Sequence, residues 1–564
     1  MAFKTTRRGL LAGSAGAVTV AGAGLAGCSS ARIIGFNPAE ASLDIANAGE
    51  PLSMDPHKAT GTWENNLVGN LFMGLTTEDE FADAVPGMAL RWETAADGLS
   101  WTFFLRDAVW SDGVPVTAYD FEFALRRIMN PESLAQYASV LYAIKNAEAI
   151  NSGEQEDLTT LGVTAIDDKT LRIDLEHPAP YLLGLLRHYT AYPLPRHIFA
   201  PDYAKFPIPQ GLVPGQGSRW IKPQNVVTNG AYLLKQWISN YIVTFEKNPL
   251  FWDADNVQFK KLYFYPTTDA NVQARGVASG ERGWATNFPS NQVRDLRARL
   301  APGSVRVAPY LLTQYTSFNT TRAPFNDVRV RQALTMAVNR EFIATQIYKT
   351  EPLPAYRNVP YGIEAYPGKG EPGPRYTWAE QSLAERQAQA RRLLEAAGYG
   401  PNNPLTFEFK HRNSGDNPRV AVVLQSDWRA IAPWVTVELV GTEVQVHYAS
   451  LRAKDFVAGD GGWVADFNDA KNYLFLHETR TGEQNYSGFS NPIYDQLMRD
   501  ADNERDAIRR MEIMMQAEQI VLDECPICPT VFDTSRNLID PRIKGYSDNI
   551  EDIHRARWFK FDPV

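Results

Sequence analysis

Two cysteines near the carboxyl end of the chain stand at a spacing that supports chemistry. Cys525 and Cys528 form the sequence Cys-Pro-Ile-Cys, a spacing found in disulfides, redox centres and zinc sites. A metal site needs more ligands, and none of the eight histidines stands at ligand spacing beside another histidine or beside these thiols. We therefore interpret the pair as structural, at the start of a strand, with a small disulfide left open, and we expect no metal.

The signatures of common enzymes are missing from the sequence. No serine lies in Gly-x-Ser-x-Gly, no glycine-rich loop ends in Gly-Lys-Ser/Thr, and His477-Glu478 lacks the second histidine of a zinc protease helix. The many acidic residues include no pair that the sequence singles out as catalytic. We expect a protein that is not an enzyme and that uses no cofactor.

One carboxylate, Asp466, ends the distinctive segment Gly462-Trp463-Val464-Ala465-Asp466. Two roles are open from the residues alone. The side chain either caps a turn, or it is enclosed, in which case an opposite charge must meet it.

The elements expected around these residues alternate between strands and helices. Residues 99–109 alternate as a strand, and Thr117 is the expected cap of a helix through Met129, with Asp120 three residues on. From about Ala31 to Phe72 we expect short strands and turns, with a loop at 54–57.

The second half of the chain has the clearest periodicity. Residues 405–409 and 435–439 alternate as strands on either side of a helical stretch at about 419–431, which predicts a parallel strand–helix–strand unit. Further helices are expected at 382–398 and 506–523. This alternation predicts an α/β fold.

Composition describes a protein that folds in water. The chain has 564 residues, of which 44% are apolar and 21% charged, so two or three domains are expected and wholesale disorder is not. The net charge is −9, with Lys and Arg scattered among acids. Nucleic acid is therefore excluded as a partner.

The N-terminus has the pattern of an export signal. Arg7 and Arg8 precede a stretch from Gly9 to Gly27 without a charge, and Cys28 follows Leu25-Ala26-Gly27. A membrane-spanning helix is disfavoured because Gly and Ala dominate the stretch. We expect a signal at 1–28 whose Cys28 receives a lipid that anchors the protein to the membrane; the arginines fit either twin-arginine or Sec export.

Six motifs are similar to those of one family, and they occur in its order. They are Ser53-Met54-Asp55-Pro56-His57, WSDGVPVTAYDF at 110–121, TNGAYLLKQW at 228–237, NPLFWD at 248–253, PFNDVRVRQAL at 324–334 and GWVADFND at 462–469. Together they resemble the oligopeptide-binding proteins of ABC importers, over essentially the whole chain after Cys28.

The resemblance implies a bilobed periplasmic-binding-protein fold of type II with an additional inserted α/β domain. The implied division is domain I at 29–72, 197–311 and 531–564, domain II at 73–196, and domain III at 312–530. Two lobes joined by hinge strands suit a protein that closes around its ligand.

The resemblance also implies the ligand-binding residues. The carboxylate matching Asp466 pairs with the ammonium of the peptide N-terminus. Main-chain groups of Gly462 and Val464, and of Thr62 on the other lobe, bond the peptide backbone as an added strand would, independently of its side chains. Three further side chains match residues that line the cleft: Trp463, Tyr137 and Asn413.

Two positions depart from well-studied relatives. Asp460 and Pro418 stand where those relatives have a basic residue and a histidine that help hold the peptide carboxylate. An ionised Asp460 would repel that carboxylate. Either Arg412, Arg419 or Arg452 substitutes for the missing cations, or the preferred ligands are longer, cationic or blocked, which leaves the preferred length open. We expect a positive charge at position 460 to strengthen binding of short peptides with a free carboxylate.

The expected partners are an oligopeptide, the permease of an ABC importer and, through the lipid, the membrane; the protein is expected to be a monomer in the periplasm or cell envelope. The same fold also binds murein peptides, opines, nickel, haem and sugar oligomers. A binder of a non-peptide cationic or modified-peptide ligand is therefore the alternative.

Overall fold

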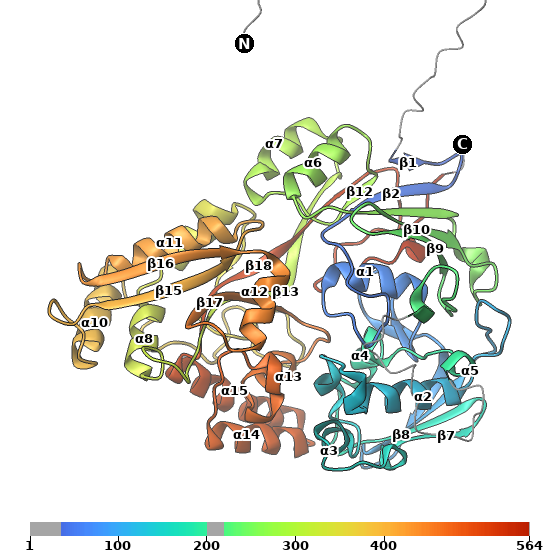
Figure 1. Ribbon diagram of the computed structural model, residues 1–564, viewed down its shortest axis with the longest axis horizontal. Helices are drawn as coiled ribbons and strands as arrows, with labels where there is room; N and C mark the ends of the chain where they lie inside the picture. Colours follow the sequence, from blue (N-terminus) through green and yellow to red (C-terminus); the bar gives the residue numbers. More distant parts are fainter. Residues whose placement is uncertain (1–34, 200–218, 563–564) are drawn as a thin grey trace, which may run out of the picture. The chain divides into compact units, whose positions relative to one another are not determined.

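The computed structural model describes residues 35–199 and 219–562, and its main sheet has twelve strands in that part of the chain (Figure 1). The order along the sheet is β16 (Val435–Thr442), β15 (Leu405–Arg412), β17 (Ala458–Val464), β13 (Val305–Phe318), β18 (Ile527–Ile539), β12 (Trp284–Ala285), β2 (Ser42–Asn47), β11 (Lys261–Pro266), β10 (Ile242–Lys247) and β9 (Tyr232–Ile238), with β1 (Phe36–Asn37) on β2 and β14 (Leu353–Pro354) on β18.

Residues 73–196, which we call the insert, form two smaller sheets. These are β3 (Thr76–Glu78) with β4 (Ala84–Pro86), and β5 (Ala89–Thr94), β6 (Ser100–Leu105), β8 (Thr170–Asp174) and β7 (Val163–Asp167) in that order. All pairs in these sheets are antiparallel.

Helices accompany both parts. The helices in residues 35–199 are α1 (Thr62–Leu71), α2 (Ala118–Met129), α3 (Ala147–Ser152), α4 (Leu182–Leu185) and α5 (Arg196–Phe199). The helices in residues 219–562 are α6 (Ala270–Ala278), α7 (Val293–Arg299), α8 (Val328–Met336), α9 (Arg340–Phe342), a π-helix at Ile343–Tyr348, α10 (Leu383–Ala396), α11 (Asn417–Arg429), α12 (Val444–Arg452), α13 (Lys471–Leu474), α14 (Pro492–Asn503) and α15 (Ala507–Glu524).

The capping residues expected from the sequence begin their helices. The Thr117 amide donates to Asp120 at 2.8 Å at the start of α2, the Ser382 amide donates to Glu385 at 2.9 Å before α10, and Asp506 accepts from the Arg509 amide at 2.8 Å before α15. Each bond satisfies a main-chain or side-chain group that the helix end leaves open.

The parallel unit of the second half is also confirmed. β15 and β16 pair in parallel from Leu405 with Val435 to Arg412 with Thr442, and α11 connects them. Pro418, at one of the two departures from the relatives, lies in the first turn of α11, where the missing N–H costs no hydrogen bond.

The expectation of only strands and turns before Phe72 was wrong, because α1 occupies Thr62–Leu71. The sequence pattern that marks the beginning of this helix is Gly61 followed three residues later by Glu64. The Glu64 carboxylate accepts from the amides of Gly61 at 2.9 Å and Thr60 at 2.8 Å, which makes it a capping residue.

The expected joints between domains I and III fall inside two long strands. β13 pairs with β18 and, over its second half, with β17, so the two strands run side by side (Figure 1). We call residues 312–530 the distal unit, which contains a separate apolar cluster that includes Phe407, Phe409 and Trp428. The division of the chain into these domains stays a prediction.

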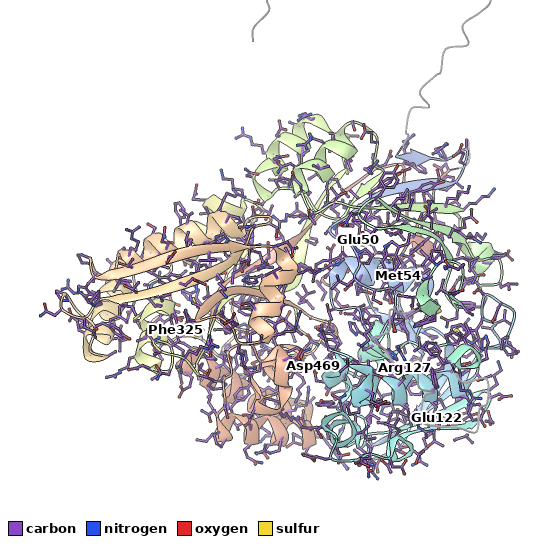
Figure 2. The ribbon with its side chains drawn as sticks, viewed as in Figure 1. Glu50, Met54, Glu122, Arg127, Phe325 and Asp469 are labelled. Atoms are coloured by element: carbon purple, nitrogen blue, oxygen red, sulfur yellow. The ribbon has the colours of Figure 1, made fainter. Side chains whose placement is uncertain are left out.

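A buried ion pair fixes the first of the six motifs. Arg127 of α2, labelled in Figure 2, donates to both carboxylate oxygens of Asp55, at 3.1 and 2.6 Å. Both side chains are at most 2% exposed. Burial alone would raise the pKa of Asp55, but the Arg127 guanidinium brings it below its usual value. Asp55 is therefore a structural residue that ties a loop to the insert.

Both cysteines are free and buried. Cys525 ends α15 in the left-handed conformation and Cys528 lies in β18, so the structure has no disulfide here. Burial raises the pKa of the Cys525 thiol to about 12. Within 35–199 and 219–562, no helix is long and apolar enough to cross a membrane.

Candidate functional site

Asp466 lies directly after β17, where the distal unit meets the insert. The Tyr137 hydroxyl of the insert donates to its Oδ2 at 2.9 Å, and Nε2 of His188, also in the insert, lies 3.5 Å from its Oδ1. The Asp466 side chain is 13% exposed. The structure thus brings together Asp466 and Tyr137, two of the residues expected from the sequence.

Asn472 orients two of these expected residues. Its side-chain oxygen accepts from the Trp463 indole at 2.8 Å and from the Asp466 amide at 3.1 Å, and its amide group lies 3.4 Å from the Asp466 carboxylate. Trp463 is buried, with its ring 6.0 Å from that of Tyr137. Asn472 was missed because no periodicity marks it.

The Asp466 carboxylate has no cationic partner. Burial, more than any other cause, raises its pKa to about 7, although hydrogen bonds from Tyr137 and Asn472 lower it. His188 does not supply a charge, because burial and the nearby Arg187 lower its pKa to about 3. Among the described residues, no Lys or Arg pairs with Asp466, so the site as it stands calls for a positive group.

The outer edge of β17 is open beside this carboxylate. β15 pairs with β17 only at Ala458 and Gly459, and no other strand in the described chain covers that edge. The Ala465 amide donates to the Leu311 carbonyl at 2.9 Å, in register with β13. Because main-chain groups of an antiparallel strand point alternately to the two sides, those of Gly462 and Val464 point to the open edge.

Packing against β13 also explains why a glycine occupies position 462. A Cβ atom there would lie 2.8 Å from the Gln314 side chain of β13, closer than carbon and oxygen atoms pack. The glycine lets β17 lie against β13 while its own edge stays open.

The roles of Thr62 and Asn413 in ligand binding stay predictions. Thr62 begins helix α1, so its main chain offers a helix N-terminus and not a strand edge. Asn413 is exposed after β15, beside Gly441, and makes no contact with Asp466. Cys28 lies outside the described residues.

Asp460 is not a free acid, which overturns the reason for expecting repulsion. Its carboxylate accepts from Nε of Arg412 at 2.9 Å and lies 2.8 Å from Nε2 of His447. Burial favours a raised pKa, but Arg412 and His447 outweigh it and hold the pKa of Asp460 at about 2. A cation at position 460 would face Arg412, so we no longer expect it to strengthen binding.

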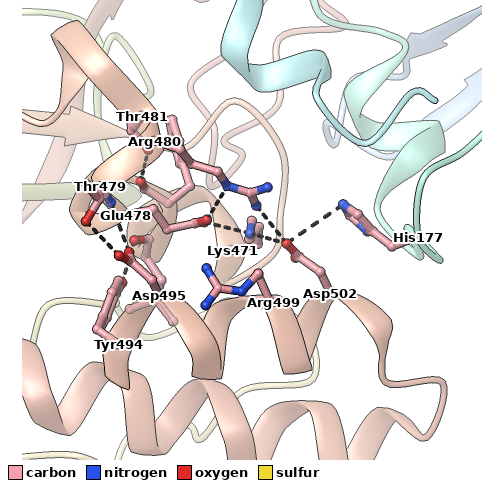
Figure 3. Close-up of polar contacts among 12 residues, drawn as sticks. His177, Lys471, Glu478, Thr479, Arg480, Thr481, Tyr494, Asp495, Arg499 and Asp502 are labelled. Atoms are coloured by element: carbon pink, nitrogen blue, oxygen red, sulfur yellow. Dashed lines mark hydrogen bonds and ion pairs between the residues drawn. The ribbon is translucent and has the colours of Figure 1, made fainter. Parts of the chain in front are cut away.

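A seam of contacts joins the insert to the distal unit beside Asp466. The rings of Tyr181 and Phe467 stack with centroids 4.6 Å apart. Figure 3 shows the polar part: Arg480 bonds Asp502 at 3.0 Å, and His177 of the insert lies 3.8 Å from Asp502. A small pocket lined by residues of both parts, among them Tyr142, His177, Phe467 and Arg480, lies along the seam.

One ion pair of this seam is suited to a test. Arg480 of the distal unit meets Glu148 of the insert at 3.0 Å, with both side chains partly exposed. We expect Glu148→Gln to weaken ligand affinity by at most about fivefold, since such pairs contribute about 0.2–1 kcal/mol. Calorimetry against Glu154→Gln, an exposed acid of the same unit, is the check; equal affinities would show that the pair does not stabilise the seam.

Comparison with known proteins identifies the chain as a bacterial solute-binding protein, a class that is not enzymatic. The chain belongs to the bacterial extracellular solute-binding proteins, family 5, whose middle region matches residues 83–485. It is 34% identical to the murein peptide-binding protein MppA of Escherichia coli, over 90% of this chain and 91% of that one. It is 33% identical to the oligopeptide-binding protein OppA of Salmonella typhimurium, over 90% of each.

Solved structures agree on the fold, which is the bilobed α/β fold with an additional domain. The TM-score is 0.85 to Haemophilus influenzae OppA in complex with the peptide RPPGFSPFR, at 31% identity and covering 93% of this chain and 99% of that one. The TM-score to E. coli MppA is 0.84, at 32% identity and covering 92% of this chain and 98% of that one. To the unliganded open form of MppA the TM-score is only 0.66, at 31% identity and covering 93% of this chain and 97% of that one. The structure is therefore more similar to the peptide-bound OppA than to the unliganded open form of MppA.

Proposed function

We propose that this protein captures short peptides between its two lobes and delivers them to an ABC importer. The observation that supports this most is Asp466, a largely buried carboxylate that pairs with no Lys or Arg of residues 35–199 and 219–562 and lies beside an open strand edge. A peptide supplies both missing parts, because its terminal ammonium neutralises the carboxylate and its backbone pairs with Gly462 and Val464.

Arg452 is the residue that we assign to the peptide carboxylate. Of the three candidate arginines, Arg412 is paired with Asp460 and Arg419 with Asp416. Arg452, half-buried at the end of α12, makes no ion pair within the described residues. Burial raises the pKa of the Tyr448 and Tyr486 hydroxyls, and the positive charge of Arg452 opposes this rise.

We expect Arg452→Gln to weaken binding of peptides with a free carboxylate by about tenfold, because a hydrogen bond between charged groups contributes about 1.5 kcal/mol or more. The C-terminal amides of the same peptides should bind the variant and the native protein alike. Arg505→Gln, at an exposed position without a side-chain partner, is the matched control. A loss of equal size for acids and amides would contradict the assignment.

Mass spectrometry of ligand released from freshly purified protein, with calorimetry of di- to pentapeptides, tests the proposed function itself. Recovery of peptides with a free amine supports it. Murein peptides fit the same site and are the second candidate, favoured by the similarity to E. coli MppA. Recovery of a non-amine solute, with no peptide binding, would refute both.

Cys28 completes the proposal as the point of lipid attachment that holds the protein at the outer face of the membrane, next to its permease. Cys28→Ser should release the protein from the membrane fraction.

A further inference from the structure

The open edge of β17 ends at a defined point. Two residues before Gly462, the next main-chain carbonyl to face this edge is that of Asp460. It is already occupied, because Nε2 of His447 lies 2.7 Å from it and 2.8 Å from the Asp460 carboxylate. His447 is fully buried, so a ligand strand cannot reach this carbonyl without displacing the imidazole.

The Nδ1 side of the His447 imidazole also has a partner. Its Nδ1 lies 3.2 Å from the Thr442 hydroxyl, which fits a ring that donates from Nε2 and accepts at Nδ1. Asp460 is fixed in turn by the Arg412 amide at 3.0 Å and by Nε of Arg412 at 2.9 Å. The block is therefore a packed part of the distal unit.

The donors of Arg412 are also in use. Besides Asp460, they reach the Tyr448 hydroxyl at 3.0 Å, the Asn417 side chain at 3.2 Å and the Gln314 side chain at 3.4 Å. A ligand that extended this far would meet a neutralised cluster in which four of the five side-chain N–H groups of Arg412 are already bonded.

The register of a peptide follows from these positions. A peptide whose ammonium meets Asp466 runs antiparallel to β17, with its first residue opposite Val464 and its third opposite Gly462. Its fifth residue falls opposite Asp460, whose main-chain carbonyl is already bonded to His447. An N–H or C=O group buried there without a partner lowers affinity.

We propose that His447, together with Asp460 and Arg412, limits the ligand to about three residues in the extended register. This inference rests on the proposed function and adds the ligand length to it. Position 460 thereby determines length, in place of the charge selection first expected from its acid.

Calorimetry with di-, tri-, tetra- and pentaalanine on the native protein tests the limit without a mutation. We expect the highest affinity for the tripeptide and at least about tenfold weaker binding of the pentapeptide, which corresponds to about 1.4 kcal/mol. A pentapeptide that binds as tightly as the tripeptide would overturn the limit. Failure of every peptide to bind would instead refute the proposed function.

His447→Ala adds a direct test of the block. The pentapeptide should gain at least about fivefold in affinity while the tripeptide changes by less than about twofold. His197→Ala, in α5 and beside Asp112, is the control that should change neither. An unchanged ratio in a folded His447→Ala protein would overturn the role of His447; if that variant does not fold, the alanine series on the native protein decides.

Discussion

Asp466→Asn should lower the affinity for peptides with a free amine by about a hundredfold to several thousandfold. The carboxylate and the ammonium become a buried pair in the complex, and removing one partner of such a pair costs about 3–5 kcal/mol. The asparagine keeps the hydrogen bonds available to Tyr137 and Asn472, so the loss should report charge and not a collapsed site.

Calorimetry on folded protein measures this effect, and Asp255→Asn is the control because that acid is exposed and lies outside both the insert and the distal unit. A loss below about threefold for Asp466→Asn would contradict an amine at this position.

Arg127→Met should have the largest effect on stability. It leaves the Asp55 carboxylate buried without a cation, which is expected to cost about 3–5 kcal/mol. In thermal or urea denaturation, Arg172→Met, at a half-exposed position of β8, should change little by comparison.

Asp55→Asn combined with Arg127→Met should recover part of that stability, since no unpaired charge then remains. Equal stabilities for the single and the double variant would show that the ion pair is not what fixes the Met54–His57 loop to α2. Ligand affinity should follow stability only, because neither residue contacts Asp466.

Local patterns in the sequence were sufficient for most of the fold. Alternation at Leu405 and Val435 predicted two strands, and caps at Thr117 and Ser382 predicted the beginnings of helices, because these signals act within a few residues. The helix after Gly61 was missed although Glu64 marked it, since the neighbouring Pro and Asp residues favoured turns.

Contacts between distant segments were beyond local patterns. Asp466 and Tyr137 were identified together only through the family resemblance, since 329 residues separate them. His188 and Asn472 gave no signal, because their roles arise from packing around the carboxylate.

Asp460 shows why charge cannot be interpreted from a motif alone. From the sequence, the family motif places Asp460 as an acid near the carboxylate of the ligand. In the fold, β15 ends beside β17, and this brings Arg412 to Asp460, while α12 brings His447. The acid thus becomes part of a neutral cluster.

The central claim is that Asp466 receives the amine of a peptide, and N-acetylation of one peptide tests it most directly. Calorimetry should show trialanine binding the native protein at least about a hundredfold more tightly than N-acetyltrialanine, with the difference nearly abolished in Asp466→Asn. Equal affinity of the native protein for the two peptides would contradict the account.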